Sequence, residues 1–210
     1  EVASRLAVET LADFFRSTSN EPMTTWPYKM DAGDKHDANR MVNGIKLANL
    51  KIYDRSQIDE HCHGMGTTIV AALFLDDKVL IGHVGDSRVY RFRDDKLTQL
   101  TEDHSLLNDY IRMKKVTAEE AGKFAHKNVI VRALGMKESV QVDLMADGHQ
   151  LGDIYLLCSD GLSGMIDDGG LATILSEERD LDKAVERLIG RANQNGGIDN
   201  ITCILARIEE

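Results

Sequence analysis

The chain has 210 residues, 42% of them hydrophobic, which is enough to bury one sizeable core. Its 35 acidic and 25 basic residues give a net charge of −10, so bulk charge does not attract it to nucleic acid or to anionic membranes, and divalent cations suit it better as partners. No apolar run approaches the roughly 20 residues that a membrane-spanning helix needs.

Two helices are expected in the first third of the chain. Apolar residues recur at helical spacing over residues 2–15 and again over residues 37–58. Residues 17–35, which contain two prolines and a glycine, are expected to form a loop between them, and residues 61–66 a turn.

Short β-rich runs follow over residues 67–101, separated by Asp-Asp pairs. This pattern predicts an antiparallel meander of four strands with hairpin turns at Asp76-Asp77 and Asp94-Asp95. The first run, TTIVAALFL, is apolar on both faces, so we expect it to be buried between layers.

The second half of the chain alternates helical and extended patterns. We predict helices over 105–113, 168–177 and 181–195, a helix start at Thr117, extended segments over 129–134 and 140–145, and strands over 153–158 and 201–208. Helices flanking antiparallel strands favour an α+β fold, with the helices packed outside strand layers.

The three cysteines, Cys62, Cys158 and Cys203, are far apart and lack C-x-x-C spacing. We expect buried, reduced thiols in a cytoplasmic protein. A cysteine phosphatase needs a phosphate-binding loop that ends in arginine, and the residue six positions after each cysteine is not arginine. That class is therefore disfavoured.

Three aspartates lie at the ends of apolar segments: Asp86 in HVGDSR, Asp160 in LLCSDG and Asp199 in GGIDNIT. Each has a glycine within two residues, which we expect to adopt a backbone conformation that a side chain would forbid. For a single site, ordinary turn chemistry is the favoured explanation of such a pair. Three carboxylates at neighbouring strand ends would repel one another without a cation, and oxygen ligands of this kind suit Mg²⁺ or Mn²⁺.

Six segments occur in an order typical of one family: GMGTTIVAALF, GHVGDSRVYRF, LTEDHS, HKNVIVRALG, YLLCSDGLSGMI and GGIDNITCILARI. Together they resemble the metal-dependent protein serine/threonine phosphatases of type 2C (the PPM family), bacterial branch, over the whole chain. The resemblance implies an αββα sandwich of two antiparallel β-sheets flanked by helices. It also implies a dinuclear Mg²⁺ or Mn²⁺ centre whose bridging water attacks phosphoserine or phosphothreonine. The implied substrates are phosphoproteins made by bacterial Ser/Thr kinases.

The resemblance also implies roles for the three aspartates. Asp160 and Asp199 match ligands of the dinuclear centre, and Asp86 matches an acid that helps to hold a third, weaker ion. Arg88, in the same motif as Asp86, is expected to be structural.

The stretch from His104 to Lys127 matches the flap that lies beside the active site in this family and influences substrate choice. His104, Ser105 and His126 are its candidate substrate-region residues. For His126, a structural hydrogen bond is the favoured role.

Two family motifs that precede the first helix do not occur in the chain: an Arg-…-Asn-Glu-Asp segment and an Asp-Gly-Met-Gly-Gly-His segment. They supply the phosphate-binding arginine, the bridging aspartate and the histidine proposed as general acid. We therefore expect residues 1–210 to form a single catalytic domain that lacks its N-terminal strands and first metal-ligand motifs. No catalytic residue is assigned in this chain, and by itself it should have little activity.

Two alternatives remain open. A non-catalytic member of the same fold would bind phosphoproteins or another partner, although three retained metal acids favour the enzyme. His61-Cys62-His63 could share a zinc ion on an extended segment, but no second ligand pair occurs at suitable spacing, so a turn is favoured.

Overall fold

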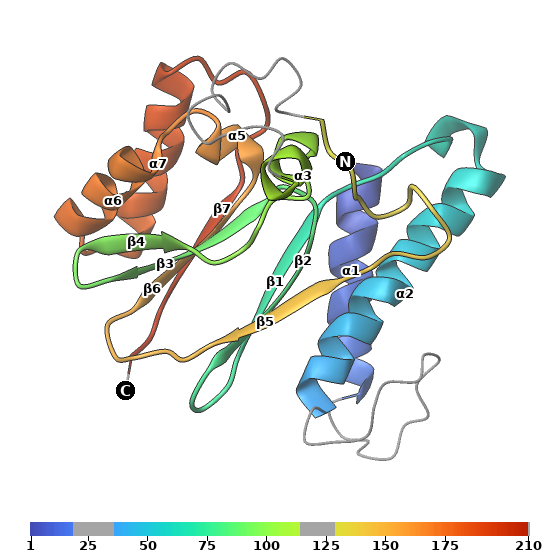
Figure 1. Ribbon diagram of the computed structural model, residues 1–210, viewed down its shortest axis with the longest axis horizontal. Helices are drawn as coiled ribbons and strands as arrows, with labels where there is room; N and C mark the ends of the chain where they lie inside the picture. The colour runs from blue at the N-terminus through green and yellow to red at the C-terminus, as the bar shows by residue number, and fades with distance from the viewer. Residues whose placement is uncertain (19–35, 114–128, 210) are drawn as a thin grey trace. The chain divides into compact units, whose positions relative to one another are not determined.

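The computed structural model of the chain describes residues 1–18, 36–113 and 129–209 (Figure 1). Residues 19–35 of the loop expected over 17–35, the helix start at Thr117 and the candidate His126 lie outside the described residues, whereas Ser17 and Thr18 continue the first helix. The chain divides into two compact units, Glu1–Gly85 with His104–Asp147, and Asp86–Asp103 with Gly148–Glu210.

The first unit is built on a three-stranded antiparallel sheet in the order β1-β2-β5. Its elements are α1 (Val2–Thr18), α2 (His36–Ile58), the 3-10 helix η1 (Glu60–Cys62), β1 (Ile69–Phe74), β2 (Val79–Val84), α3 (Leu106–Arg112) and β5 (Asp143–Asp147). The apolar stripes of α1 and α2, including Ala7, Ile45 and Ile52, share one core with β1 and β2. Figure 1 shows these two helices side by side.

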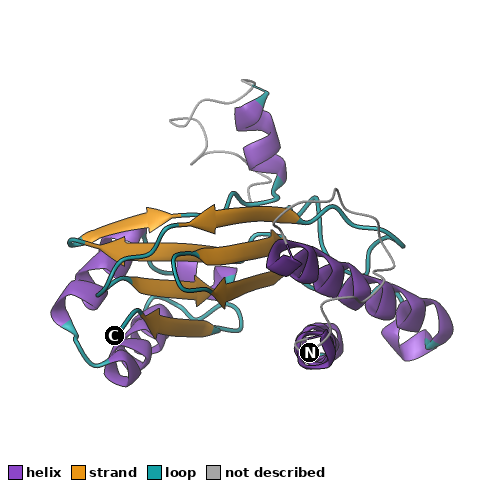
Figure 2. Ribbon diagram, turned by 90° about the horizontal axis from the view of Figure 1, so that it is seen from below, coloured by secondary structure: helices purple, strands orange, loops and turns teal. Residues whose placement is uncertain are grey.

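The second unit is built on a four-stranded antiparallel sheet in the order β4-β3-β6-β7. Its elements are β3 (Arg88–Arg93), β4 (Lys96–Gln99), β6 (Ile154–Cys158), α5 (Asp160–Ser163), α6 (Asp168–Glu177), α7 (Leu181–Gln194) and β7 (Cys203–Arg207). Leu156 and Cys158 of β6 pack in one core with Leu171 of α6 and Leu188 of α7. Neighbouring strands of each sheet run in opposite directions, as the arrows in Figure 2 show.

The predicted α+β class with two antiparallel sheets and flanking helices is therefore confirmed. The hairpin at Asp94-Asp95 is also confirmed: both residues have positive φ, 50° and 58°, as a two-residue type I′ turn requires. No described helix is both long enough and apolar enough to cross a bilayer.

The predicted four-strand meander is wrong at one joint. β1 pairs with β2 and β3 pairs with β4, but β2 takes β5 as its other neighbour and β3 takes β6. Gly85, directly after β2, has φ +115°, a conformation that L side chains rarely adopt, so the strand ends there.

Two further expectations need correction. β1 is mostly half-buried, because it is an edge strand of the described sheet, and the fully buried strand is β2, which has a partner on each side. Residues 129–134 form isolated bridges rather than a strand, and the strand expected from Val140 begins at Asp143. Sequence pattern alone does not reveal whether a β-rich segment finds a partner strand.

Candidate metal centre

The register of β3 against β6 brings Asp86 and Asp160 to the same end of the four-stranded sheet. Arg88 lies opposite Cys158 in this antiparallel pair. Asp86 comes two residues before Arg88, and Asp160 comes two residues after Cys158. Because antiparallel strands run in opposite directions, both aspartates extend beyond the same edge of the ladder.

Contacts of Ser159 bring the Asp199 segment to that same end. The Ser159 N–H donates to the carbonyl of Thr202 at 3.0 Å. The Ser159 hydroxyl accepts from the N–H of Thr202 and donates to the carbonyl of Asn200, both at 3.1 Å. One residue therefore fastens the chain just before Asp160 to the chain just after Asp199.

Gly161 permits the closest approach in this region. A Cβ atom added there would lie 2.3 Å from the carbonyl oxygen of Asn200 and 3.0 Å from its carbonyl carbon. The expectation of an unusual backbone conformation at Gly161 is wrong, because the residue lies inside helix α5 and its φ is not positive. Glycine is needed there for space, so that α5 can start against the Asp199-Asn200 peptide.

The electrostatics of this end suit a cation. Asp86 is buried, and burial together with the nearby charge of Asp160 raises the pKa of Asp86 to about 6. Asp160 and Asp199 are exposed, and the Asp199 carboxylate also accepts from the N–H of Asn200 at 2.7 Å. Carboxylate oxygens are the ligands that Mg²⁺ and Mn²⁺ prefer, and a bound cation would relieve the repulsion between Asp86 and Asp160.

Arg88 has the structural role expected of it. Its guanidinium donates to both carboxylate oxygens of Asp103, at 2.9 and 2.7 Å, and to the hydroxyl of Tyr90 at 2.8 Å. These three hydrogen bonds fix the start of β3, two residues after Asp86.

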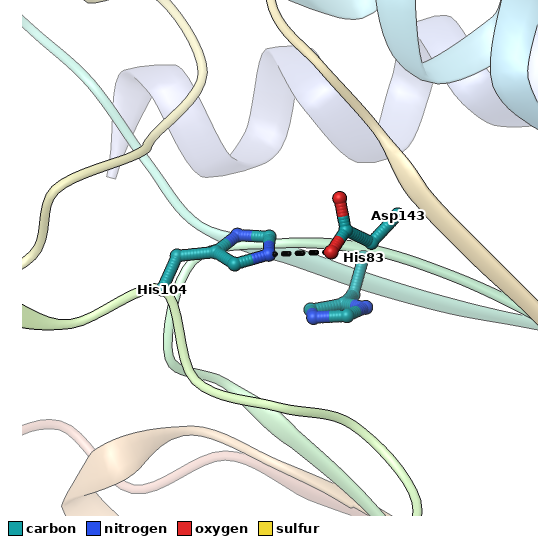
Figure 3. A group of neighbouring side chains, drawn as sticks. All are labelled: His83, His104 and Asp143. Carbon is teal, nitrogen blue, oxygen red and sulfur yellow. Dashed lines mark ion pairs between the residues drawn. The ribbon is translucent and has the colours of Figure 1, made fainter. Parts of the chain in front are cut away.

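A second group of ligand-type side chains lies in the first unit (Figure 3). Within the described part of the chain, the only set of three His, Cys, Asp or Glu ligand atoms within 4.8 Å of one another belongs to His83, His104 and Asp143. The rings of His83 and His104 are stacked, with centroids 4.6 Å apart, and His104 Nε2 lies 3.2 Å from Asp143 Oδ2. No sequence pattern predicted this group, because its members come from three separate segments.

We interpret this second group as a hydrogen-bond network rather than a metal centre. The Gly85 N–H donates to Nδ1 of His104 at 3.0 Å, so we assign the proton of the neutral ring to Nε2, which faces Asp143 and cannot bind a metal without losing that proton. Arg132 Nη1 already lies 2.6 Å from Asp143 Oδ1 and 3.1 Å from His104 Nε2. A guanidinium in that position repels a second cation.

The pKa values in this network agree with that interpretation. Burial, assisted by the charge of Arg132, lowers the pKa of His104, so the ring is neutral at pH 7. Burial by itself would raise the pKa of Asp143, but hydrogen bonds from His104 and Arg132 outweigh it and hold that pKa below its ordinary value.

Two of the three flap candidates thus have local structural partners. His104 is buried, and its N–H donates to the carbonyl of Gly85 at 2.9 Å. Ser105 caps α3, where its hydroxyl accepts from the N–H of Asn108 at 3.3 Å. Cys62, from the alternative zinc motif, is buried with its Sγ 3.5 Å from Asp59, and the described residues place no further ligand around it.

Comparison with known proteins decides the family. The family model described as protein phosphatase 2C matches residues 1–206. The chain belongs to this family. It is 37% identical over 209 residues to a serine/threonine phosphatase, stp, of Listeria innocua, a match that covers 98% of the chain and 77% of that relative. A protein phosphatase PhpP of Streptococcus pneumoniae is 37% identical over 166 residues, 79% of the chain and 67% of the relative.

Solved structures of bacterial PP2C members agree. The serine/threonine phosphatase Stp1 from Staphylococcus aureus has a TM-score of 0.86 and 31% identity, and the match covers all of this chain and 78% of that one. A PstP catalytic domain in complex with two manganese ions has a TM-score of 0.80 and 31% identity, over 99% of this chain and 80% of that one. The family resemblance and the αββα sandwich as its fold class are therefore confirmed. The chain is a metal-dependent serine/threonine phosphatase by family.

Proposed function

We propose that Asp160 and Asp199 of this PP2C member hold two Mg²⁺ or Mn²⁺ ions, and that Asp86 helps to hold a third. The protein would then hydrolyse phosphoserine and phosphothreonine in proteins. The observation that supports the proposal is that strand register and the contacts of Ser159 bring the three segments that carry these acids to one end of the second unit's sheet. The two manganese ions bound by a solved relative support the choice of metal.

Bound at this end, two such ions would supply a water of lowered pKa and neutralise the phosphoryl group. The chain's own residues do the positioning. Ser159 holds the end of β6 to the Asp199 segment, and Gly161 allows α5, which begins at Asp160, to lie against the backbone of Asn200. The buried Asp86 adds a third carboxylate, whose pKa is raised to about 6 by burial and by the charge of Asp160.

We further propose that the substrates are phosphoproteins made by bacterial Ser/Thr kinases and that the protein acts in the cytoplasm. The names of the relatives support the first point. The three free thiols support the second, because disulfides are typical of oxidising compartments. We also propose that residues 1–210 belong to a single catalytic domain.

The test is phosphate release from a phosphothreonine peptide by the full-length protein. We expect release to require Mn²⁺ or Mg²⁺ and to stop on chelation. Asp160→Ala and Asp199→Ala should each lower the rate by roughly two orders of magnitude or more, because each weakens an ion that supplies several kcal/mol of transition-state stabilisation. Asp54→Ala, an exposed aspartate on α2, is the matched control and should leave the rate unchanged.

Two results would count against the proposal. Metal-dependent turnover that survives Asp160→Ala and Asp199→Ala would refute the site assignment. Tight binding of the phosphopeptide with no release of phosphate under any metal condition would favour the non-catalytic alternative instead.

A further inference from the structure

Two cysteines face each other across neighbouring strands of the second unit. Cys158, the last residue of β6, is the direct antiparallel partner of Cys203, the first residue of β7. The N–H of Ser159 donates to the carbonyl of Thr202 at 3.0 Å. In an antiparallel pair, a hydrogen bond from the residue after Cys158 to the residue before Cys203 shows that the two cysteines occupy a non-hydrogen-bonded position.

Side chains at a non-hydrogen-bonded position lie closer together than side chains at a hydrogen-bonded position. The Cα atoms of a non-hydrogen-bonded antiparallel pair are about 4.5 Å apart, against about 5.5 Å for a hydrogen-bonded pair. Disulfides accept Cα separations of roughly 4.4–6.8 Å, most often about 5.5–6 Å. The two cysteines therefore lie within bonding reach, at the short end of that range.

The two thiols also share one face of the sheet. Direct cross-strand partners point the same way, and Cys203 packs against the core cluster that contains Cys158. Cys158 is 3% exposed, whereas Cys203 is only half-buried. A small oxidant can reach the pair from the side of Cys203, while Cys158 is already in place to react next.

We propose that Cys158 and Cys203 are a redox modification site that a peroxide converts to a reversible disulfide. Burial raises the pKa of the Cys203 thiol, so it loses its proton as it reacts: its sulfur attacks one peroxide oxygen, the O–O bond breaks, and the leaving hydroxide takes up that proton as water, so that Cys203 becomes a sulfenic acid. The sulfur of Cys158 then attacks the sulfur of Cys203, the S–O bond breaks, and a second water leaves with the thiol proton. Two thiols and one hydrogen peroxide give one disulfide and two waters, and two electrons pass from sulfur to the peroxide.

The expected consequence concerns the metal centre, and this part of the inference rests on the proposed function. A disulfide with the most common Cα separation needs β6 and β7 to move apart by about 1 Å at this pair. The next residue, Ser159, holds the Asp199 segment through hydrogen bonds, and Asp160 follows it. Oxidation is therefore expected to spread Asp160 from Asp199 and to weaken metal binding, and reduction is expected to restore it.

Peptide mapping tests the disulfide without reference to activity. The full-length protein is treated with hydrogen peroxide, remaining thiols are blocked with N-ethylmaleimide, and peptides are analysed by mass spectrometry without reduction. We expect a cross-linked peptide pair that contains Cys158 and Cys203, lighter by two hydrogen atoms and lost after dithiothreitol. Oxidation confined to sulfinic acid on single cysteines, or a cross-link through Cys62, would overturn the proposal.

Two variants provide matched controls. Cys62→Ser removes the third, buried cysteine and should leave the cross-link intact, whereas Cys203→Ser should abolish it. Mn²⁺ titration of the oxidised protein should show affinity at least tenfold lower than that of the reduced protein, with no such change for oxidised Cys203→Ser. A disulfide that forms without any change in Mn²⁺ affinity would refute the coupling. If the proposed phosphatase function is wrong, the reduced wild-type protein will fail to release phosphate. If the redox proposal is wrong, the failure will appear only after oxidation, so the two failures are distinguishable.

Discussion

Replacement of Gly161 by alanine is the sharpest perturbation of the candidate metal centre that leaves every proposed ligand in place. The new Cβ would lie 2.3 Å from the carbonyl oxygen of Asn200, and real Cβ atoms essentially never come closer than 3.0 Å, so the two segments must separate by 0.7 Å or more. Both contacting atoms belong to the backbone of Asn200, so no flexible side chain can absorb the shift. Metal ligands need to be placed within about 0.2 Å.

We expect two measurable effects of Gly161→Ala. Overpacking should lower the free energy of unfolding by about 1–3 kcal/mol, measured by urea denaturation. Displacement of Asp160 from Asp199 should weaken Mn²⁺ binding by about 10–100-fold, the range observed when residues that orient metal ligands are changed, measured by calorimetric titration of the full-length protein.

Gly190→Ala is the matched control. Gly190 lies inside α7, and a Cβ there would meet nothing within 4 Å. This substitution should stabilise the protein by up to about 1 kcal/mol and leave Mn²⁺ affinity unchanged. If Gly161→Ala behaves like Gly190→Ala in both assays, the close approach of α5 to the Asp199 segment does not organise the site, and the reasoning is refuted.

Three further predictions concern residues in both units. Arg93→Met leaves the buried Asp153 carboxylate without its two guanidinium hydrogen bonds and should cost about 3–5 kcal/mol of unfolding free energy, against less than about 1 kcal/mol for the exposed Arg16→Met. Burial alone would raise the pKa of Asp153, but the hydrogen bonds from Arg93 outweigh it and lower that pKa. The stabilisation that Asp153 contributes to folding is therefore present above 3.8, the pKa of the unfolded chain, and is lost as the pH falls through the lowered pKa of the folded protein. Urea denaturation at neutral and at strongly acidic pH checks this expectation. Asp86→Ala should weaken only the weakest ion in a Mn²⁺ titration, and an unchanged titration curve would exclude its role. Asn49→Ala removes three hydrogen bonds to the loop before β5 and should lower thermal stability by about 2–3 kcal/mol; a cost near zero would contradict the anchoring role of this side chain.

Local patterns were sufficient to predict most of the helices and strands of the chain. The helical spacing over residues 37–58 gave α2 almost to the residue, and the start and end predicted for the helix over 168–177 agree with α6. These successes depend on amphipathic periodicity, which each segment carries by itself. The pairing of β2 with β5 was beyond reach, because partner choice depends on contacts between segments about 60 residues apart.

The candidate site was predictable in part for the same reason. Each aspartate at a strand end is visible in sequence, and so is its neighbouring glycine. The juxtaposition of Asp86 with Asp160 depends on the register of β3 with β6, and only the structure provides it. The hydrogen-bond network of His104, Arg132 and Asp143 left no signal in sequence at all, since its members lie in separate motifs.

The proposed function requires Asp160 and Asp199 to be ligands of bound metal ions. Anomalous diffraction from crystals of the full-length protein soaked in Mn²⁺ tests it most directly. We predict anomalous peaks at roughly 2.0–2.2 Å from carboxylate oxygens of both residues, with a weaker peak beside Asp86. Anomalous density bound elsewhere, for instance at His83, His104 and Asp143, with none near Asp160, would contradict the account.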